Sequence, residues 1–201
     1  PERFQAIQRI HMVNQKEKGL SVNRFAAFLD GEQLIPKHPD PAMHRHLRKA
    51  LIEVLQLFQS FHEKGLNDPD FRRVLLDLVK WMGNHLEKWL KGADCETAMP
   101  KVVWYGDTTK SQRYFLYYLM LVGCDVLLFH PEGKDEFRQL DPEQKLSFVF
   151  TYPDTSALEP FPTEKPQRKA TVAYRSAKEL DTVLHNEDSL MYKPWQFREH
   201  T

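Results

Sequence analysis

Residues 101–131 read KVVWYGDTTKSQRYFLYYLMLVGCDVLLFHP and predict a strand, a turn, a helix and a second strand. Two short runs, 102–105 and 126–129, are rich in residues that favour β structure, and each is bounded by proline or glycine. In a parallel β-α-β unit, the turns that follow the two strands meet at one edge of the sheet. This edge is where α/β proteins commonly bind ligands.

The helix between the two strands is expected to lie in the core. Thr109 and Gln112 have the spacing of a capping box at its start, and Gly123 suits the left-handed backbone that ends many helices. Residues 114–122 carry no charge, so this helix needs to be covered on two sides. We expect one side to lie on the sheet and the other to pack against the preceding helices.

The first half of the chain, residues 1–97, predicts a helical unit because its apolar residues recur at intervals of three or four. Helices are expected over about residues 1–19, 21–31, 41–63 and 69–92. Ser21 and Asp68 are suited to cap the second and fourth of these. Phe4 and Phe61 fall on the predicted inward faces of the first and third.

Residues 98–201 are expected to form an α/β unit. Leu146, Phe148, Phe150 and Tyr152 occupy alternate positions and predict a strand with one buried face. A proline-rich connection over 153–168 precedes a short predicted strand, 171–174, and a short helix, 177–184.

The predicted fold class is therefore α/β, with α+β as the alternative. It places a helical unit, residues 1–97, against a small Rossmann-like β-α-β unit, residues 98–201. Because the chain begins at Pro1 and ends abruptly at Thr201, we expect it to be a fragment of a longer protein.

The composition is typical of a folded protein with no strong global charge. The 28 basic and 28 acidic side chains cancel, which argues against nucleic acid as a partner. Only two cysteines are present and no signal peptide is recognisable, so a reducing cytoplasm is the expected location. The longest apolar run, 114–122, is far shorter than the roughly 18 to 20 residues of a membrane helix, so no membrane span is predicted.

The turn after the first predicted strand is the main candidate site. It joins a strand to a helix N-terminus, where backbone N–H groups and the helix dipole favour an anion such as phosphate. His130 follows the second strand and should approach this turn, and an imidazole is the obvious candidate for proton transfer there. His130 and Asp107 are the candidate catalytic residues. The candidate ligand-binding residues are Gly106, Thr108, Thr109, Lys110, Ser111, Arg168, Lys169 and Arg175.

Each part of this site has a structural alternative. The turn lacks a GxGxxG fingerprint or a P-loop, so it also fits a capped turn without a ligand. A histidine before proline also fits a structural role. The basic residues Arg168, Lys169 and Arg175 also fit solvated charges paired with neighbouring carboxylates.

Three histidines, His38, His44 and His46, lie close together in the segment KHPDPAMHRH. Converging imidazoles bind zinc or nickel, but no nearby cysteine completes a ligand set. We therefore interpret them as surface residues and predict no metal site. The sequence identifies no cofactor.

Three segments resemble the bacterial YceG-like family: VVWYGDTTKSQRYFLYYLMLVGCDVLLFHP (102–131), EPFPTEKP (159–166) and RKATVAYRSAKELDTVLHNEDSLMYKPWQFR (168–198). Members of this family are described as components of a biosynthetic module encoded beside tellurite-resistance and general stress genes. The resemblance implies a cytoplasmic role in making or transferring a nucleoside-like or sugar-like metabolite. It supplies no catalytic residues.

Two functions fit these observations. The first is a transferase-like domain that binds a nucleotide or a phosphosugar at the turn 106–111. The second is a non-catalytic assembly or regulatory module that binds another protein of the stress cluster through the aromatic segment 192–197. The sequence leaves both open.

Overall fold

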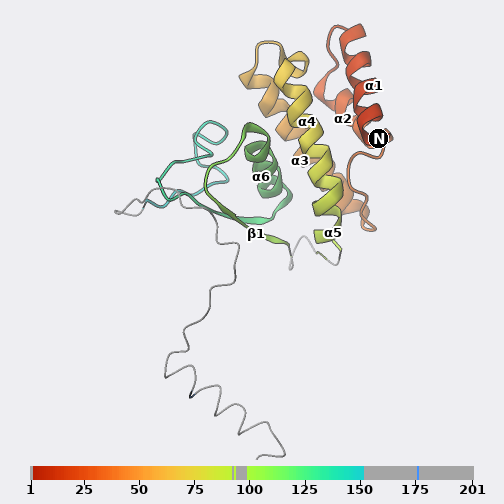
Figure 1. Ribbon diagram of the computed structural model, residues 1–201. Helices are drawn as coiled ribbons and strands as arrows, with labels where there is room; N and C mark the ends of the chain where they lie inside the picture. The colour runs from red at the N-terminus through yellow and green to blue at the C-terminus, as the bar shows by residue number, and fades with distance from the viewer. Residues whose placement is uncertain (1, 92, 94–98, 152–175, 177–201) are drawn as a thin grey trace, which may run out of the picture. The chain divides into compact units, whose positions relative to one another are not determined.

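Helices dominate the part of the chain described by a computed structural model, which comprises residues 2–91, 93, 99–151 and 176 (Figure 1). Its elements are α1 (Glu2–Lys16), α2 (Val22–Gly31), α3 (Pro41–Phe61), η1 (Gly65–Asn67), α4 (Pro69–Trp81), η2 (Met82–Leu86), α5 (Glu87–Trp89), β1 (Lys101–Tyr105), α6 (Lys110–Val122) and β2 (Asp125–Phe129). These elements lie in one compact unit, Pro1–Glu159. A second unit, Pro160–Thr201, lies outside the described residues except for Ser176.

The helices predicted in the first half of the chain are confirmed, and their starts have clear local causes. The side chains of Ser21, Asp40 and Asp68 each accept a hydrogen bond from a backbone N–H in the first turn of the helix that follows. Pro41 and Pro69 occupy the first helical positions, where a missing N–H costs no hydrogen bond. The division of the chain into domains at residue 97 stays a prediction.

Aromatic rings from three helices meet in the core of the helical part. The ring of Phe71 lies 5.4 Å from that of Phe25 and 5.1 Å from that of Phe58, measured between centroids. All three side chains are fully buried or nearly so. The inward placement of Phe4 and Phe61 was wrong: they are 44% and 52% exposed, because both lie near the ends of their helices.

The predicted helix over residues 69–92 is not uniform. After α4 the chain widens into one π-helical turn, η2, and then returns to a short α-helix, α5. Met82, Leu86 and Leu90 remain buried at four-residue intervals through this change. Gly83 lies within η2 against the guanidinium of Arg3, where a Cβ atom would come within 2.2 Å of its Nη1 atom. A larger side chain would therefore displace Arg3 from this turn.

The predicted β-α-β unit is confirmed. β1 and β2 pair in parallel, with Val103 opposite Leu127 and Tyr105 opposite Phe129. α6 begins with the predicted capping box and ends at Gly123, whose φ is 99°. The described sheet has two strands in a mostly helical structure, and its Rossmann-like character stays a prediction.

As expected, α6 lies between the sheet and the earlier helices (Figure 1). It packs against α3 and α4 on one side and against β2 on the other. Tyr118 and Leu119 are fully buried, and the Tyr118 hydroxyl donates a hydrogen bond to the Leu47 carbonyl oxygen over 3.4 Å. This helix therefore connects the helical part to the sheet.

α6 covers one face of the sheet and leaves the other exposed. Val102, Trp104, Val126 and Leu128 are partly buried and pack against the core. On the opposite face Val103, Leu127 and Phe129 are 66%, 54% and 46% exposed. The described part of the chain thus presents an open apolar sheet face.

The strand predicted over residues 146–152 was wrong, since residues 146–151 are not in a strand. The buried Asp141 carboxylate accepts hydrogen bonds from the backbone N–H groups of Lys145, Leu146 and Ser147, so these groups are held in a turn. Alternating apolar residues form a strand only where their backbone N–H and C=O groups are free to pair with a neighbouring strand. Phe148 is accordingly 85% exposed.

Several predictions fall outside the described residues, namely the connection 153–168, the strand 171–174, the helix 177–184 and the aromatic segment 192–197. Among the helices that are described, none has the length and apolar character needed to cross a membrane.

Candidate functional site

Asp107 and His130 come together at the carboxyl end of the sheet. The Gly106 N–H donates a hydrogen bond to the Phe129 carbonyl oxygen over 2.8 Å, which extends the strand pairing by one step. The φ of Gly106 is 89°, a conformation that favours glycine and turns the chain away from β1. The Nε2 atom of His130 then lies 3.0 Å from Oδ1 of Asp107.

The hydrogen bonds of His130 indicate which ring nitrogen carries the proton. The backbone N–H of Glu132 donates to Nδ1 over 3.2 Å, so Nδ1 holds a lone pair. Nε2 therefore carries the hydrogen and donates it to Asp107. The His130 side chain is 3% exposed while that of Asp107 is 51% exposed, so Asp107 is the member of the pair that solvent and ligands can reach.

A buried carboxylate, Glu136, is the third member of this cluster. Its Oε1 atom lies 3.7 Å from His130 Nε2, and its Oε2 atom accepts hydrogen bonds from Thr108 Oγ1 and, over 3.0 Å, from Arg113 Nη2. The Glu136 side chain is 7% exposed, and the Arg113 guanidinium balances the charge of its carboxylate. Ligand atoms of Asp107, His130 and Glu136 lie within 4.8 Å of one another, so this group has the spacing to hold a cation.

Lys134 adds a positive charge beside Asp107. Its Nζ atom lies 3.2 Å from Asp107 Oδ1 and 2.7 Å from Glu132 Oε2. Hydrogen bonds from His130 and then from Lys134 hold the pKa of Asp107 below its ordinary value. Asp107 is therefore an ionised, half-exposed acceptor at neutral pH.

Glu136, Arg113 and Lys134 were not predicted as site residues. Lys134 and Glu136 are four and six residues beyond His130 in the same connection, and Arg113 is one helical turn beyond Thr109. Proximity to His130 and Thr109 along the chain was thus an available signal. This signal could be interpreted only once the positions of both loops were known.

The predicted anion turn uses several of its donors within the chain. The Thr109 hydroxyl accepts from the Gln112 N–H, and the Gln112 side chain accepts from the Thr109 N–H. The Thr108 hydroxyl donates to Glu136, and the Ser111 side chain is buried. The structure brings Gly106 and residues 108–111 together, and their role in ligand binding stays a prediction.

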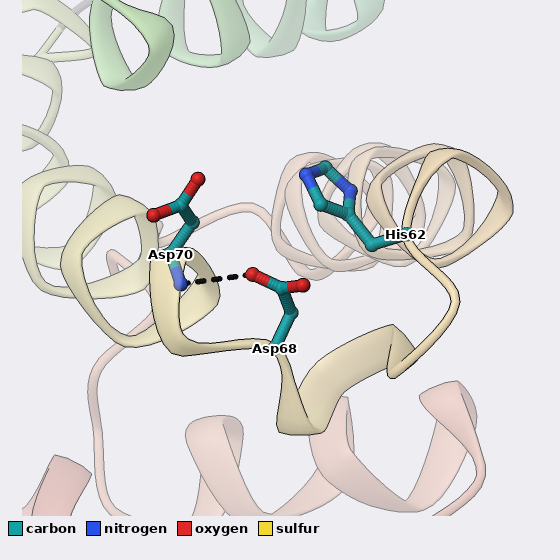
Figure 2. A group of neighbouring side chains, drawn as sticks. All are labelled: His62, Asp68 and Asp70. Atoms are coloured by element: carbon teal, nitrogen blue, oxygen red, sulfur yellow. Dashed lines mark hydrogen bonds between the residues drawn. The ribbon is translucent and has the colours of Figure 1, made fainter.

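Lys110 points to a second cluster, formed by His62, Asp68 and Asp70 (Figure 2). Its Nζ atom lies 2.5 Å from Asp70 Oδ2 and 3.5 Å from His62 Nε2. The hydrogen bond from Lys110 is the largest cause of a lowered pKa at Asp70. The ammonium group thus supplies the positive charge of this cluster and connects the N-terminus of α6 to that of α4.

The other members of the second cluster, His62 and Asp68, each form a hydrogen bond with the backbone. His62 Nδ1 donates to the Phe58 carbonyl oxygen over 2.8 Å, which leaves the Nε2 lone pair facing Lys110. Asp68 Oδ1 accepts the Asp70 N–H over 2.9 Å, as Figure 2 shows. Forty residues separate Lys110 from Asp70, so the sequence contained no local sign of this contact.

The three neighbouring histidines in residues 38–46 each bond to a different segment of the chain. Their ring nitrogens bond to backbone carbonyl oxygens of different segments: His38 to Leu90, His44 to Pro36 and His46 to Val122. They connect α3 and its preceding loop to neighbouring parts of the fold. Arg168, Lys169 and Arg175 lie outside the described residues, and their role stays a prediction.

Comparison with known proteins identifies a family and a relative for this chain. A family model described as the YceG domain matches residues 1–185. An uncharacterised protein YceG of Bacillus subtilis (strain 168) is 67% identical over 201 residues. That match covers 100% of this chain and 37% of the relative, so the chain spans little more than a third of the relative's length. No solved structure matches the chain.

Proposed function

Because this chain belongs to the YceG domain family, we propose that it provides the ligand site of a transferase-like enzyme that acts on a nucleotide or a phosphosugar. The observation that carries this proposal is the contact of Asp107 with His130 at the carboxyl end of a parallel β-α-β unit. Ligands of α/β proteins bind at this end of the strands.

In this proposal Asp107 orients a hydroxyl group of the ligand. Its carboxylate is ionised and half exposed, so it can accept a hydrogen bond from a ribose or sugar hydroxyl. His130 Nε2 lies 3.0 Å from Asp107 Oδ1 and is proposed to hold this carboxylate in position for that hydroxyl, while its own part in proton transfer stays a prediction. Glu136 and Glu132 position the ring through its two nitrogens.

The phosphate of the ligand would lie over the turn of residues 106–111, and Arg168, Lys169 and Arg175 remain proposed ligand-binding residues. Helix N-termini and arginine side chains both suit phosphate oxygens. Lys134, beside Asp107, is a described cation near the same place. Lys110 would have to exchange Asp70 for the ligand in order to take part.

We further propose that the protein acts in the cytoplasm, in a biosynthetic module for stress and tellurite resistance. Support for this role comes from the resemblance of residues 102–131, 159–166 and 168–198 to the YceG-like family. Loss of tellurite tolerance on deletion of the gene, restored by the unaltered gene, is the expected result. If a gene carrying Asp107→Asn restored tellurite tolerance to the same level, the role in tolerance would not depend on the proposed site.

A thermal shift panel of nucleotides, sugar nucleotides and sugar phosphates tests the ligand directly. A ligand at about 100 times its dissociation constant should raise the melting temperature by about 5 °C or more, because binding stabilises the folded state by mass action. Asp107→Asn should abolish this shift. Absence of a shift with every compound would contradict the proposal.

Asp125→Asn is a matched control for Asp107→Asn. Asp125 is the first residue of β2, at the end of the sheet opposite Asp107, and its carboxylate lies 4.0 Å from Lys101 Nζ. Its side chain is 79% exposed, so the substitution should leave both the fold and the ligand shift intact. Equal shifts in the two variants would remove Asp107 from the site.

A further inference from the structure

In the part of the chain that the structure describes, the face of the β1–β2 sheet that points away from α6 carries exposed apolar side chains. Val103 is 66% exposed and Leu127 is 54% exposed, and the strand register places them opposite each other. Phe129, two residues beyond Leu127 on the same face, is 46% exposed. These residues form one continuous patch, which we name the open sheet face.

Such a face is unusual for parallel strands. Parallel sheets in α/β proteins are covered on both sides, because their strands are rich in apolar residues throughout and the connecting helices lie on the faces. Here β1 and β2 are apolar at successive positions, VVWY and VLLF. Within the described residues, however, a helix, α6, covers the sheet on one side and not on the other. The strand sequences are therefore suited to a sheet with a second covering layer.

The size of the open sheet face bears on what covers it. Two paired five-residue strands make a face about 17 Å long and roughly 10 Å wide. This is a small fraction of the roughly 800 Å² per partner that a stable protein interface buries, so contact through this face alone is too small to hold a second copy of the chain. A segment of the same polypeptide needs far less area, because the tether provides a high effective concentration.

A longer relative carries additional polypeptide. The Bacillus subtilis relative matches this chain along its whole length and continues well beyond it, since the match covers 37% of the relative. We propose that the open sheet face binds an apolar helix from the additional polypeptide that longer YceG-family proteins carry outside the matched segment. This inference is independent of the proposed ligand, because it uses none of the residues of the Asp107–His130 site.

Cysteine labelling can test this proposal at single positions. Val103→Cys and Leu127→Cys are each introduced into a Cys95→Ser background, once in the 201-residue chain and once in a chimera. In the chimera, the chain replaces the matching segment of the Bacillus relative. The rate of reaction with a maleimide should fall by about tenfold or more in the chimera, because a packed helix limits access to both thiols.

Met12→Cys is the matched control. Met12 is 58% exposed on α1, away from the sheet, and its labelling rate should be the same in both proteins. Unchanged rates at positions 103 and 127 in the chimera would overturn the proposal. An equal fall at position 12 would do so too, because it would show general shielding rather than a docked helix.

Two further measurements complete the test. If labelling of the 201-residue chain falls as its concentration rises, and light scattering shows a dimer, a second copy covers the face and the proposal is wrong. Should a cysteine variant fail to fold, hydrogen exchange of β1 and β2 in the unsubstituted proteins replaces the labelling. Exchange about tenfold slower in the chimera supports the proposal, and equal exchange overturns it.

Discussion

The Nε2 atom of His130 lies 3.0 Å from Oδ1 of Asp107, and this contact joins the two segments that leave the sheet after β1 and β2. It places a nearly buried imidazole behind a half-exposed carboxylate. The charge of Asp107 is thereby stabilised by protein donors while its remaining surface faces solvent. This arrangement makes the contribution of Asp107 to stability depend on pH.

Asp107→Asn should reduce the loss of stability in acid. Hydrogen bonds from His130 and Lys134 lower the folded-state pKa of Asp107 below 3.8, so its contribution is present above that value and is lost as the pH falls through the lowered pKa. Melting temperatures measured between about pH 5 and pH 2 should therefore fall less steeply for Asp107→Asn than for the unaltered chain. Asp125→Asn should keep the original slope. Parallel curves for Asp107→Asn and the unaltered chain would contradict the prediction.

Leu119→Ala and Leu127→Ala should differ sharply, although each removes the same atoms from the β-α-β unit. Leu119 on α6 is 0% exposed, so its truncation should cost about 2–5 kcal/mol of unfolding free energy. Leu127 is 54% exposed, and its truncation should cost about 0.5 kcal/mol or less. Urea unfolding of the 201-residue chain measures both. Similar losses would show that the open sheet face is covered within this chain.

Gly123→Ala should destabilise the protein through its backbone. Gly123 has a φ of 99°, and an added Cβ would have ordinary contacts with Met99 at 3.8 Å, so the cost is conformational. We expect a loss of about 1–2 kcal/mol in urea unfolding. Gly31→Ala is the control, because Gly31 ends α2 with open space around it, and this change should stabilise the chain by about 0.5–1 kcal/mol. An unchanged free energy of unfolding in Gly123→Ala would contradict this prediction.

The thiol of Cys124 should be inert in the folded chain. Burial, with a smaller effect of Asp125, raises its pKa to about 11, so very little thiolate exists near neutral pH. In a Cys95→Ser background, reaction with a disulfide reagent at about pH 8 should be at least about 100 times slower in native protein than in urea. Equal rates in the two conditions would show that the segment around Cys124 opens readily.

Local signals in the sequence accounted for most of the helices and for both strands. Ser21, Asp68 and Thr109 cap helices because each has a short side chain that accepts a hydrogen bond from a nearby backbone N–H. Gly123 ends α6 because a left-handed backbone is easily adopted without a Cβ atom. Such effects act over a few residues, so they are readable without knowledge of the fold.

The errors arose where an unexpected partner held the backbone or where no neighbour covered an apolar side chain. The alternation at residues 146–150 suggested a strand, but Asp141 holds the backbone N–H groups at its start in a turn. Phe61 continued the apolar pattern of α3, but it ends that helix with 52% of its surface exposed. Periodicity reports which side of an element is apolar, and it does not report whether a neighbour covers it.

The candidate site, too, could be predicted only in part from the sequence. The rule that strand ends meet at one edge of a parallel sheet was enough to predict that His130 would approach the turn containing Asp107. The partners of Glu136 and Lys110 required the folded chain, because Arg113 and Asp70 are 23 and 40 residues away from them. Lys110 was predicted to bind a ligand, which stays a prediction, and packing of α6 against α4 places its ammonium group beside Asp70.

Short-range chemistry in the amino-acid order thus specified the helices, the parallel pair of strands and the edge where a site could form. Packing determined which charges pair at that edge and which face of the sheet is left exposed by the residues that the structure describes. The reason is one of range: capping and periodicity act within a few residues, whereas ion pairing and burial depend on segments brought together by the core.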